Sequence, residues 1–338
     1  MEKSDQALTL VLLALLGGFL ASAVEVQPSI NPAVVGGTVM FSLSPPMSLK
    51  SGSWALGETL ILNWVGDQQA FFPGYSGRAS VNLTTGALTL SSLKLTDSGV
   101  YVVQSNDPAL SANASITVIE TVSNVTLSTN QTDLTEFNSS AVMRCSVSSG
   151  SPLSFLWMNG SSTITAGIRV QVTDGNATLI VTNVTRYDSG PFSCHVFNLI
   201  SNGTSNPVNF TISYGPENMA LTVNGLSGTS FPVGSNLTML CSVNSSPPAQ
   251  LQWAFRGNLM NTTGAILQLF LVSQNQSGQY SCLAFNNRTN MLNSITKDIT
   301  ISKSEQQVMN VLLLLLSLTG FLSSLPAWLT QLLEDFTE

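Results

Sequence analysis

Two copies of one cysteine and tryptophan pattern constrain the fold of this chain more than any other feature. In each copy a tryptophan follows the first cysteine by twelve residues, and a phrase containing serine and glycine ends on the second cysteine. This spacing is typical of a β-sandwich in which the tryptophan packs on a disulfide that joins the two sheets. Four cysteines allow three pairings, and a zinc site would need closely spaced Cys-X-X-Cys pairs, which are absent. The pattern predicts the bridges Cys145–Cys194 and Cys241–Cys282, packed against Trp157 and Trp253.

The phrase before the second cysteine carries a further feature. Tyr280 stands two positions before Cys282, where its hydroxyl group is expected to hold the corner that precedes the last core strand. Phe192 occupies the same position before Cys194, so we expect that corner to lack the hydrogen bond. Cysteine, tryptophan and tyrosine-X-cysteine in this order form the signature of the immunoglobulin fold.

A third copy of the phrase lies upstream and lacks cysteines. It runs from Leu93 to Val103, with Tyr101 at the corner and Val103 at the cysteine position. Phe41 is the candidate for the other missing cysteine. We expect two apolar side chains to replace the bridge, which removes about 2–4 kcal/mol of cross-link stabilisation and recovers part of it through burial.

Two arginine–aspartate pairs repeat with the same spacing. Arg78 precedes Asp97 by 19 residues, and Arg169 precedes Asp188 by 19 residues. In such sandwiches an arginine at the start of one strand reaches the aspartate of this turn as a bidentate pair. The phrase that ends on Cys282, in the third domain, has Gln276 at the aspartate position and no arginine at the matching place. A structural role is favoured over an acid–base role, because a locked ion pair does not serve as a general base at neutral pH.

The cysteine-free copy contains two tryptophans. Trp64 is the expected core residue, because the triplet Leu62-Asn63-Trp64 is similar to Leu251-Gln252-Trp253. Trp54 then falls in a long loop from Met47 to Thr59. There it either anchors a partner, as exposed aromatic residues do, or folds back over the end of the sandwich.

Short alternating runs bounded by Gly, Asn, Ser and Pro fill the chain from Val24 to Ser302. Many short strands at regular spacing indicate an all-β chain. The sequence therefore predicts three tandem immunoglobulin-like β-sandwich domains, the first V-like without a disulfide and the other two C2- or I-like with one each. The expected limits are 24–119, 120–213 and 216–302.

Both ends of the chain carry apolar segments. Residues 1–23 contain an apolar run followed by Ala21-Ser22-Ala23, which is typical of a signal peptide, and a buried N-terminal helix is the alternative. Residues 308–329 carry no charge and are long enough to span a bilayer. A transmembrane helix, a lipid-anchor signal and an alternative end that releases the ectodomain are all open, and membrane attachment is preferred.

The composition combines low charge with many glycosylation sequons. Charged residues make up 9% of the chain and the net charge is −7, which argues against a nucleic-acid partner. Asn-X-Ser/Thr sequons are dense enough for glycans to replace charge as the solubilising layer. The acceptor asparagines are Asn82, Asn113, Asn124, Asn130, Asn138, Asn159, Asn176, Asn183, Asn202, Asn209, Asn236, Asn244, Asn261, Asn275 and Asn287.

Five further motifs are distinctive enough to compare with known protein families. They are Gly66-Asp67-Gln68-Gln69-Ala70, Gly74-Tyr75-Ser76-Gly77-Arg78, Thr96-Asp97-Ser98-Gly99-Val100-Tyr101, the linker Tyr214-Gly215-Pro216 and the run from Ser246 to Trp253. With the cysteine-free first domain, they resemble the carcinoembryonic-antigen-related cell adhesion molecules and their hepatic and glial relatives, over about residues 24–302. In that family the N-terminal domains pair with each other, or with related members, through one face of the sandwich. Some members serve as receptors for microbial surface proteins or signal through cytoplasmic tyrosine motifs.

The resemblance implies a cell-surface adhesion and recognition glycoprotein that binds itself or other surface proteins through its N-terminal domain. Its expected place is the extracellular side of the plasma membrane, with secretion as the alternative. A soluble or anchored decoy or immune-modulating receptor is the second hypothesis, since no tyrosine follows Tyr280 to support a signalling tail. A purely structural matrix protein is a third class.

An enzyme is not expected. The single histidine, His195, directly follows Cys194 on a predicted strand, and alternation points its side chain away from the core. The sequence contains no phosphate-binding loop, metal-ligand cluster or nucleophile elbow, so neither a cofactor nor a metal is expected.

Alternation along the strands also selects the contact face of the first domain. On the strand that ends at Val103, the side chains of Val102, Gln104 and Asn106 point outward, and on another strand Val65 does. The resemblance implies that Gln104 matches a glutamine that family members use in N-domain pairing. The predicted contact residues are Val65, Val102, Gln104, Asn106 and Trp54.

Glycans constrain the contact face, because a glycan on it would block it. Asn82 is expected on the other sheet, soon after Arg78, whereas Asn113 is closer to the final strand and to the face.

Overall fold

The computed structural model describes residues 24–303, 311 and 314–315, and nearly all of them lie in β-strands and turns. The predicted signal peptide, 1–23, and most of the apolar segment 308–329 lie outside these residues. The chain divides into two compact units. One holds the residues up to Asn130 with Val142–Ile180 and Pro191–Val208, and the other holds Gln131–Ala141, Val181–Gly190 and the residues from Asn209 onward.

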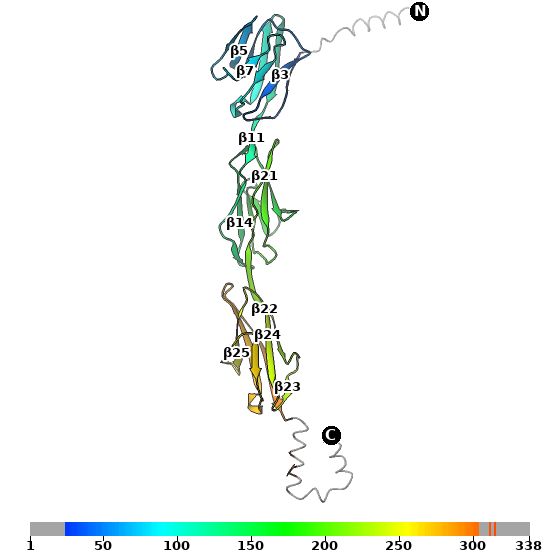
Figure 1. Cartoon of the computed structure of the whole chain (residues 1–338), viewed down its shortest axis with the longest axis vertical. Coiled ribbons are helices and arrows are strands. Elements are labelled where there is room, and N and C mark those ends of the chain that lie inside the picture. The colour runs from blue at the N-terminus through cyan, green and yellow to red at the C-terminus, as the bar shows by residue number, and fades with distance from the viewer. Residues whose placement is uncertain (1–23, 304–310, 312–313, 316–338) are drawn as a thin grey trace, which may run out of the picture. The chain divides into compact units, whose positions relative to one another are not determined.

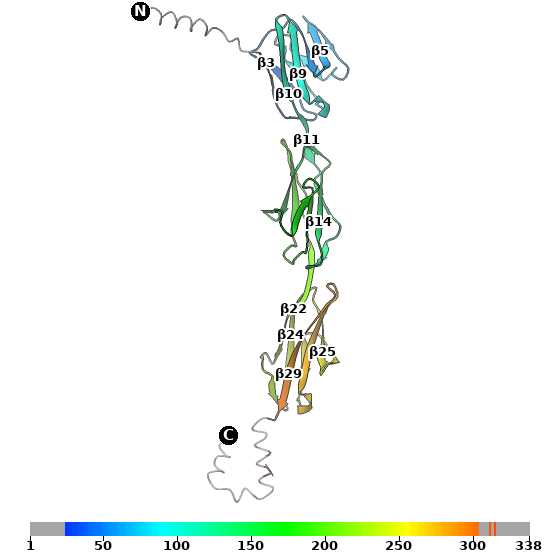
Figure 2. The same ribbon diagram turned by 180° about the vertical axis from the view of Figure 1, so that it is seen from behind.

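The first sandwich consists of a four-stranded and a five-stranded sheet. Figure 1 shows β7 of the first sheet, and Figure 2, from behind, shows β9 and β10 of the second. The strands of the first sheet, in spatial order, are β1 (Glu25–Pro28), β3 (Val39–Ser44), β8 (Leu88–Leu90) and β7 (Ala79–Val81). Those of the second are β10 (Ala109–Ile116), β9 (Gly99–Asn106), β4 (Ser51–Leu56), β5 (Thr59–Val65) and β6 (Gln68–Phe71).

The same unit contains three further sheets. A parallel bridge joins β2 (Ala33–Val34) to β11 (Val118–Ser123), which also pairs with β15 (Ser149–Ser151). One four-stranded sheet consists of β12 (Thr126–Thr129), β14 (Ala141–Ser146), β19 (Thr178–Val181) and β18 (Val170–Thr173). The other consists of β17 (Ser162–Thr163), β16 (Ser154–Asn159), β20 (Phe192–Phe197) and β21 (Asn202–Thr204).

The second unit contains a four-stranded and a five-stranded sheet. The first consists of β13 (Asp133–Thr135), β22 (Thr211–Val223), β24 (Leu237–Ser246) and β27 (Ile266–Leu269). The second consists of β23 (Ser230–Pro232), β29 (Met291–Ser302), β28 (Gly278–Asn286), β25 (Gln250–Phe255) and β26 (Asn258–Thr263). Within residues 24–303, the only helical elements are the 3-10 turns η1 (Leu95–Asp97) and η2 (Gln274–Gln276).

The prediction of tandem immunoglobulin-like sandwiches is therefore confirmed, while the domain limits stay a prediction. One detail differs from the expected linker. Tyr214, Gly215 and Pro216 lie within the long strand β22, which pairs with β13 at Thr211–Ser213 and then with β24.

Both predicted disulfides are present, between Cys145 and Cys194 and between Cys241 and Cys282. The tyrosine corners are also confirmed. Tyr101 Oη donates a hydrogen bond of 2.8 Å to the carbonyl oxygen of Asp97. Tyr280 Oη donates one of 2.9 Å to the carbonyl oxygen of Gln276. Phe192, buried at the corresponding position of the other copy, has no hydroxyl group to make this bond.

The position of Trp54 differs from the sequence-based expectation. Trp54 lies on β4, is fully buried, and its indole Nε1 donates to the carbonyl oxygen of Gly86 at 2.8 Å. It lies opposite Val103, as Trp157 lies opposite Cys194 and Trp253 opposite Cys282. Trp54 is thus the core tryptophan of the first sandwich, and the prediction that it contacts a partner from a loop is wrong.

Trp64 is buried as predicted, but it lies on the neighbouring strand β5. Its indole Nε1 donates to the carbonyl oxygen of Leu49 at 3.2 Å. Trp64 therefore adds to the core without being the counterpart of Trp157 and Trp253. The reason is that the expected loop contains the strand Ser51–Leu56, whose small polar residues hid it.

The residue that replaces the first cysteine also differs. In the first sandwich Val39 pairs with Leu90, and in the third sandwich Leu237 pairs with Leu269. Leu90 and Leu269 each lie seven residues before the corner residue, Asp97 or Gln276, so the two ladders have the same register. Cys241, four residues after Leu237, then corresponds to Leu43, four residues after Val39.

Leu43 and Val103 are both buried in the core where a bridge would be. Phe41 is buried two residues earlier on the same strand. Its ring stacks on Tyr101 at 4.3 Å between centroids and lies 5.7 Å from the Trp54 ring. Apolar packing therefore replaces the bridge as expected, with Leu43 in place of Phe41.

The arginine–aspartate pair of the first sandwich is bidentate. Arg78 Nη1 and Nη2 donate to the two carboxylate oxygens of Asp97 at 2.8 and 2.6 Å, and the two side chains are 12% and 3% exposed. Arg78 also donates to the carbonyl oxygens of Gly74 and Ser92. The hydrogen bond with Asp97 is the main cause that raises the pKa of Arg78. The pairing of Arg169 with Asp188 stays a prediction.

The third corner has an arginine that the sequence pattern did not reveal. Arg256, directly after β25, donates to the carbonyl oxygens of Asn275 and Ser277 at 3.1 and 2.5 Å. Gln276 Oε1 accepts from the backbone N–H of Ser273 at 2.8 Å, as the Asp97 carboxylate does from Lys94. An arginine thus contacts this corner as well, but it comes from a different strand and bonds to backbone carbonyl oxygens instead of a carboxylate.

Candidate functional site

The outer face of the five-stranded sheet in the first sandwich carries the predicted contact residues. The register places Gln104 of β9, Ser53 of β4 and Asn63 of β5 side by side across three strands. Gln104 and Asn63 are exposed, while the residues that alternate with them, such as Trp54 and Val103, are buried. Alternation therefore predicted correctly that these side chains point outward, while their contact role stays a prediction.

A shallow hollow of about 300 Å³ lies on this face. Val65, at 72% exposed, is its most prominent apolar side chain. No charged residue lines it. The lining residues are Ser51, Gly52, Ser53, Asn63, Trp64, Val65, Gln104, Ser105 and Asn106. The structure thus brings three of the predicted contact residues, Val65, Gln104 and Asn106, to one depression.

Gly52 makes the close packing beneath the hollow possible. Gly52 pairs with Trp64 across β4 and β5. A Cβ atom at Gly52 would lie 2.6 Å from the indole ring of Trp64 and 2.7 Å from the carbonyl oxygen of Gln104. Any side chain there would displace either the buried indole or β9, which carries Gln104. Gly52 therefore sets the position of the contact residues without contacting a partner itself.

One exposed ion pair lies at the end of the face. Lys50 Nζ lies 3.6 Å from an Asp107 carboxylate oxygen, with the two side chains 81% and 68% exposed. Exposed pairs of this kind contribute little to stability. The centre of the face is thus neutral and its end carries both signs of charge.

Val102 and Asn113 lie toward the edge of the sheet that ends in β10. Val102 is half-buried, and the register places Asn113 of β10 directly opposite it. Side chains of directly paired residues share one face of a sheet. Asn113 is exposed and belongs to the sequon Asn113-Ala114-Ser115, so a glycan there would lie on the contact face.

The position of Asn82 confirms the other glycan expectation. It is exposed and directly follows β7, which belongs to the opposite sheet. A glycan on Asn82 leaves the contact face open. Fourteen of the acceptor asparagines are exposed, and Asn159 is half-buried.

Ser51 and Ser53 are contact candidates that the sequence interpretation missed. Ser51 and Ser53 were overlooked because the expected loop hid strand β4. Once β4 is recognised, alternation with Trp54 identifies both serines as outward-facing.

The described residues show no constellation that points to catalysis. His195 lies half-buried on β20, and its Nδ1 lies 3.2 Å from the hydroxyl oxygen of Thr204. Within residues 24–303 and the three described residues beyond them, no group of three or more acidic, histidine or cysteine side chains could hold a metal ion. The same part of the chain contains no helix with the length and apolar character needed to cross a bilayer.

Comparison with known proteins agrees with this architecture. Residues 131–207 match the family model described as Immunoglobulin domain. Cell adhesion molecule CEACAM16 of Rattus norvegicus is 25% identical over 246 residues, which cover 71% of this chain and 57% of the relative. The Mus musculus protein of the same name is 24% identical over 274 residues, which cover 77% of this chain and 63% of the relative. The chain thus spans less than two thirds of the length of these relatives.

Among solved structures, the match to an I-band fragment of titin covers 83% of this chain and 100% of the titin fragment, with a TM-score of 0.52 and 17% identity. At that identity the likeness concerns the fold alone. In its sequence relatives, its matched domain and its sandwich fold, the chain is therefore similar to immunoglobulin-superfamily proteins, and to the carcinoembryonic-antigen-related cell adhesion molecules among them.

Proposed function

We propose that this chain is a cell-surface adhesion and recognition glycoprotein that binds itself or other surface proteins through the outer face of the sheet β10-β9-β4-β5-β6. The observation that carries the proposal is the convergence of Val65, Gln104 and Asn106 on one uncharged hollow of the first sandwich. The sequence relatives are named as cell adhesion molecules, which supports the same class of function.

The chemistry of the face suits contact with another protein surface. An exposed apolar side chain surrounded by amides and hydroxyl groups provides burial together with hydrogen bonds that fix the register of a partner.

The experiment adds negative charge to the face. In the full chain, Val65, Gln104 and Asn106 are changed together to Asp, and self-association is measured by analytical ultracentrifugation and by aggregation of protein-coated beads. Burying unpaired carboxylates in an interface is costly, so we expect association to fall at least tenfold.

A matched control places the same charge on the opposite sheet. Gln27, Met40 and Ser80 are exposed on β1, β3 and β7, and their joint change to Asp should leave association unchanged. The same two variants are then tested against a panel of surface proteins. If the first variant associates with itself and with every partner as strongly as the unaltered chain, this face is not the recognition surface.

A further inference from the structure

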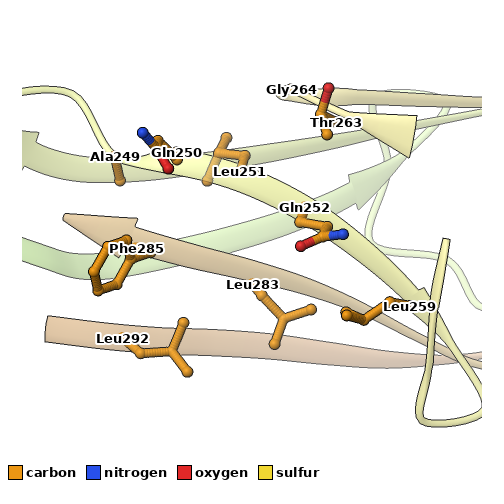
Figure 3. A pocket seen from close by; sticks show the side chains of 10 residues that line it. All are labelled: Ala249, Gln250, Leu251, Gln252, Leu259, Thr263, Gly264, Leu283, Phe285 and Leu292. Atoms are coloured by element: carbon orange, nitrogen blue, oxygen red, sulfur yellow. The ribbon is translucent and has the colours of Figure 1, made fainter. Parts of the chain in front are cut away.

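The third sandwich carries an apolar face that the recognition function does not use. Leu283 and Phe285 of β28 and Leu292 of β29 project from adjoining strands, and Leu259 lies toward the other side of the same hollow (Figure 3). The side chains of Leu259 and Leu292 are 64% and 66% exposed. The hollow measures about 800 Å³. An exposed apolar surface with polar groups around it is one mark of a contact site.

The register shows that these side chains belong to one side of the sheet. Phe285 pairs with Leu292 on one neighbour and with Gln250 on the other. Leu283 pairs with Gln252, which in turn pairs with Thr263 of β26. Two glutamine amides therefore lie between the apolar side chains of β28 and the edge strand β26.

A glycosylation sequon stands on that edge strand. Asn261-Thr262-Thr263 lies on β26, the last strand of the five-stranded sheet. Met260 packs against the core, so Leu259, Asn261 and Thr263 point to the outer side. All three are exposed, and both Leu259 and Thr263 line the hollow. Asn261 thus stands between two lining residues and on their side of the strand.

We infer that the N-glycan on Asn261 folds back over this hollow and is its occupant. Neighbouring strands lie about 4.8 Å apart, so Phe285, two strands from β26, is roughly 10 Å away. The chitobiose core of an N-glycan spans that distance from an asparagine at the edge.

The lining suits a carbohydrate. The C–H faces of sugar rings pack against the Phe285 ring and the leucine side chains. The amides of Gln250 and Gln252 offer both donors and acceptors to sugar hydroxyl groups. No charged residue lines the hollow, in agreement with a neutral occupant.

Hydroxyl-radical footprinting tests this on the full chain, purified from a glycosylating mammalian cell line. The Asn261 glycopeptide is first identified by mass spectrometry. We expect labelling of Phe285, Leu283 and Leu292 to be low in the unaltered chain and to rise severalfold in Asn261→Gln.

Two further pairs of variants separate glycan loss from the mutation itself. Thr263→Ala abolishes the sequon and should behave as Asn261→Gln, whereas Thr263→Ser keeps it and should behave as the unaltered chain. Asn244→Gln removes a glycan acceptor from β24 in the opposite sheet and should leave the labelling unchanged. An unglycosylated Asn261, or labelling that is equally high with and without its glycan, overturns the inference. Protection that depends on protein concentration instead of the glycan also overturns it, because it assigns the face to a second copy.

Discussion

Trp54 lies directly opposite Val103 on the neighbouring strand, and this pairing replaces the tryptophan-on-disulfide contact of the other two sandwiches. Without a covalent bridge, the first sandwich depends on the packing of Trp54 with Phe41, Leu43 and Tyr101.

We therefore expect Trp54→Ala to destabilise the first sandwich by about 3–5 kcal/mol, the usual cost of truncating a buried aromatic residue. Hydrogen exchange of peptides from β9, followed by mass spectrometry in the full chain, measures the loss. Val65→Ala on the same sheet is the control and should change the opening free energy by less than about 0.5 kcal/mol, because its side chain is exposed. Equal effects of the two variants would contradict the central position of Trp54.

The buried pair Arg78–Asp97 predicts a second stability effect. Asp97→Ala leaves Arg78 unpaired among buried groups and removes the acceptor for the Lys94 N–H, at a cost of about 3–5 kcal/mol. Lys50→Ala breaks the exposed pair with Asp107 and should cost less than about 1 kcal/mol. Chemical denaturation followed by hydrogen exchange compares the two variants, and similar midpoints would show that burial of the pair does not matter.

The corner tyrosine predicts a loss of stability in alkali. Burial raises the pKa of the Tyr101 phenol, and the nearby Asp97 charge raises it further. The folded state therefore favours the neutral phenol. Its contribution is complete below the unfolded pKa of about 10 and is lost as the pH rises from there toward the folded pKa.

Tyr101→Phe is the variant that tests this. It removes the hydrogen bond to Asp97, at a cost of about 1 kcal/mol at neutral pH, and also removes the alkaline loss that Tyr101 causes. Unfolding by urea at about pH 8 and about pH 11, on either side of the ordinary tyrosine pKa, measures both effects. A variant that loses as much stability between the two pH values as the unaltered chain would refute the assignment.

Arg186 forms a cluster in the second unit with two carboxylates and a ring. It donates to Glu136 at 2.5 Å and to Glu217 at 2.6 Å, and its guanidinium lies 3.7 Å from the centre of the Tyr214 ring. The hydrogen bond from Arg186 is the main cause that lowers the pKa of Glu136. This contribution is present above the unfolded glutamate pKa of about 4.3 and is lost as the pH falls through the lowered value.

Arg186→Ala should destabilise the second unit by about 3 kcal/mol at neutral pH, and the loss should shrink in acid. Arg288→Ala, which breaks an exposed pair with Asp133, is the control and should have little effect at either pH. Thermal unfolding at neutral and acidic pH provides the comparison. A constant difference between the variants across this range would exclude Glu136 as the titrating partner.

Asn113 predicts how glycosylation affects recognition. Because it lies opposite Val102 on the proposed recognition face, a glycan there competes with a partner. We expect Asn113→Gln to strengthen self-association severalfold, and Asn82→Gln, which removes an acceptor beside the other sheet, to leave it unchanged. Ser115→Thr keeps the sequon and serves as a second control. Analytical ultracentrifugation of the glycosylated chains distinguishes these outcomes, and weaker association of Asn113→Gln would contradict the placement of the face.

Patterns within short stretches of sequence predicted the disulfides and the direction in which strand side chains point. Cysteine spacing located the bridges, and alternation from Tyr101 correctly separated the outward Gln104 from the inward Val103, because side chains alternate strictly along a strand. The same alternation, continued from Cys282, identifies Leu283 and Phe285 as outward-facing, so the apolar face of the third sandwich was within reach of the sequence.

The assignment of the two tryptophans required information that the sequence does not carry locally. Which tryptophan lies opposite Val103 depends on the pairing of β4 with β9, two segments far apart in the chain. Similarity between short triplets favoured Trp64, whereas Trp54 fills the central position because its strand β4, and not β5, lies next to β9. The same reasoning applies to Leu43 and Phe41, which lie two residues apart on the same face of β3. Only the register of β3 against β8 shows which of them takes the place of the cysteine.

The absence of a covalent link in the first sandwich also determines how each domain responds to tension. An intact bridge prevents extension of the segment between Cys145 and Cys194, 49 positions apart, and of that between Cys241 and Cys282, 41 positions apart. From Glu25 to Ile116 nothing comparable limits the extension, so this sandwich can unravel over roughly 300 Å at about 3.4 Å per residue. Under tension along the chain, the first sandwich therefore has a longer stretch of chain free to extend than either sandwich that holds a bridge.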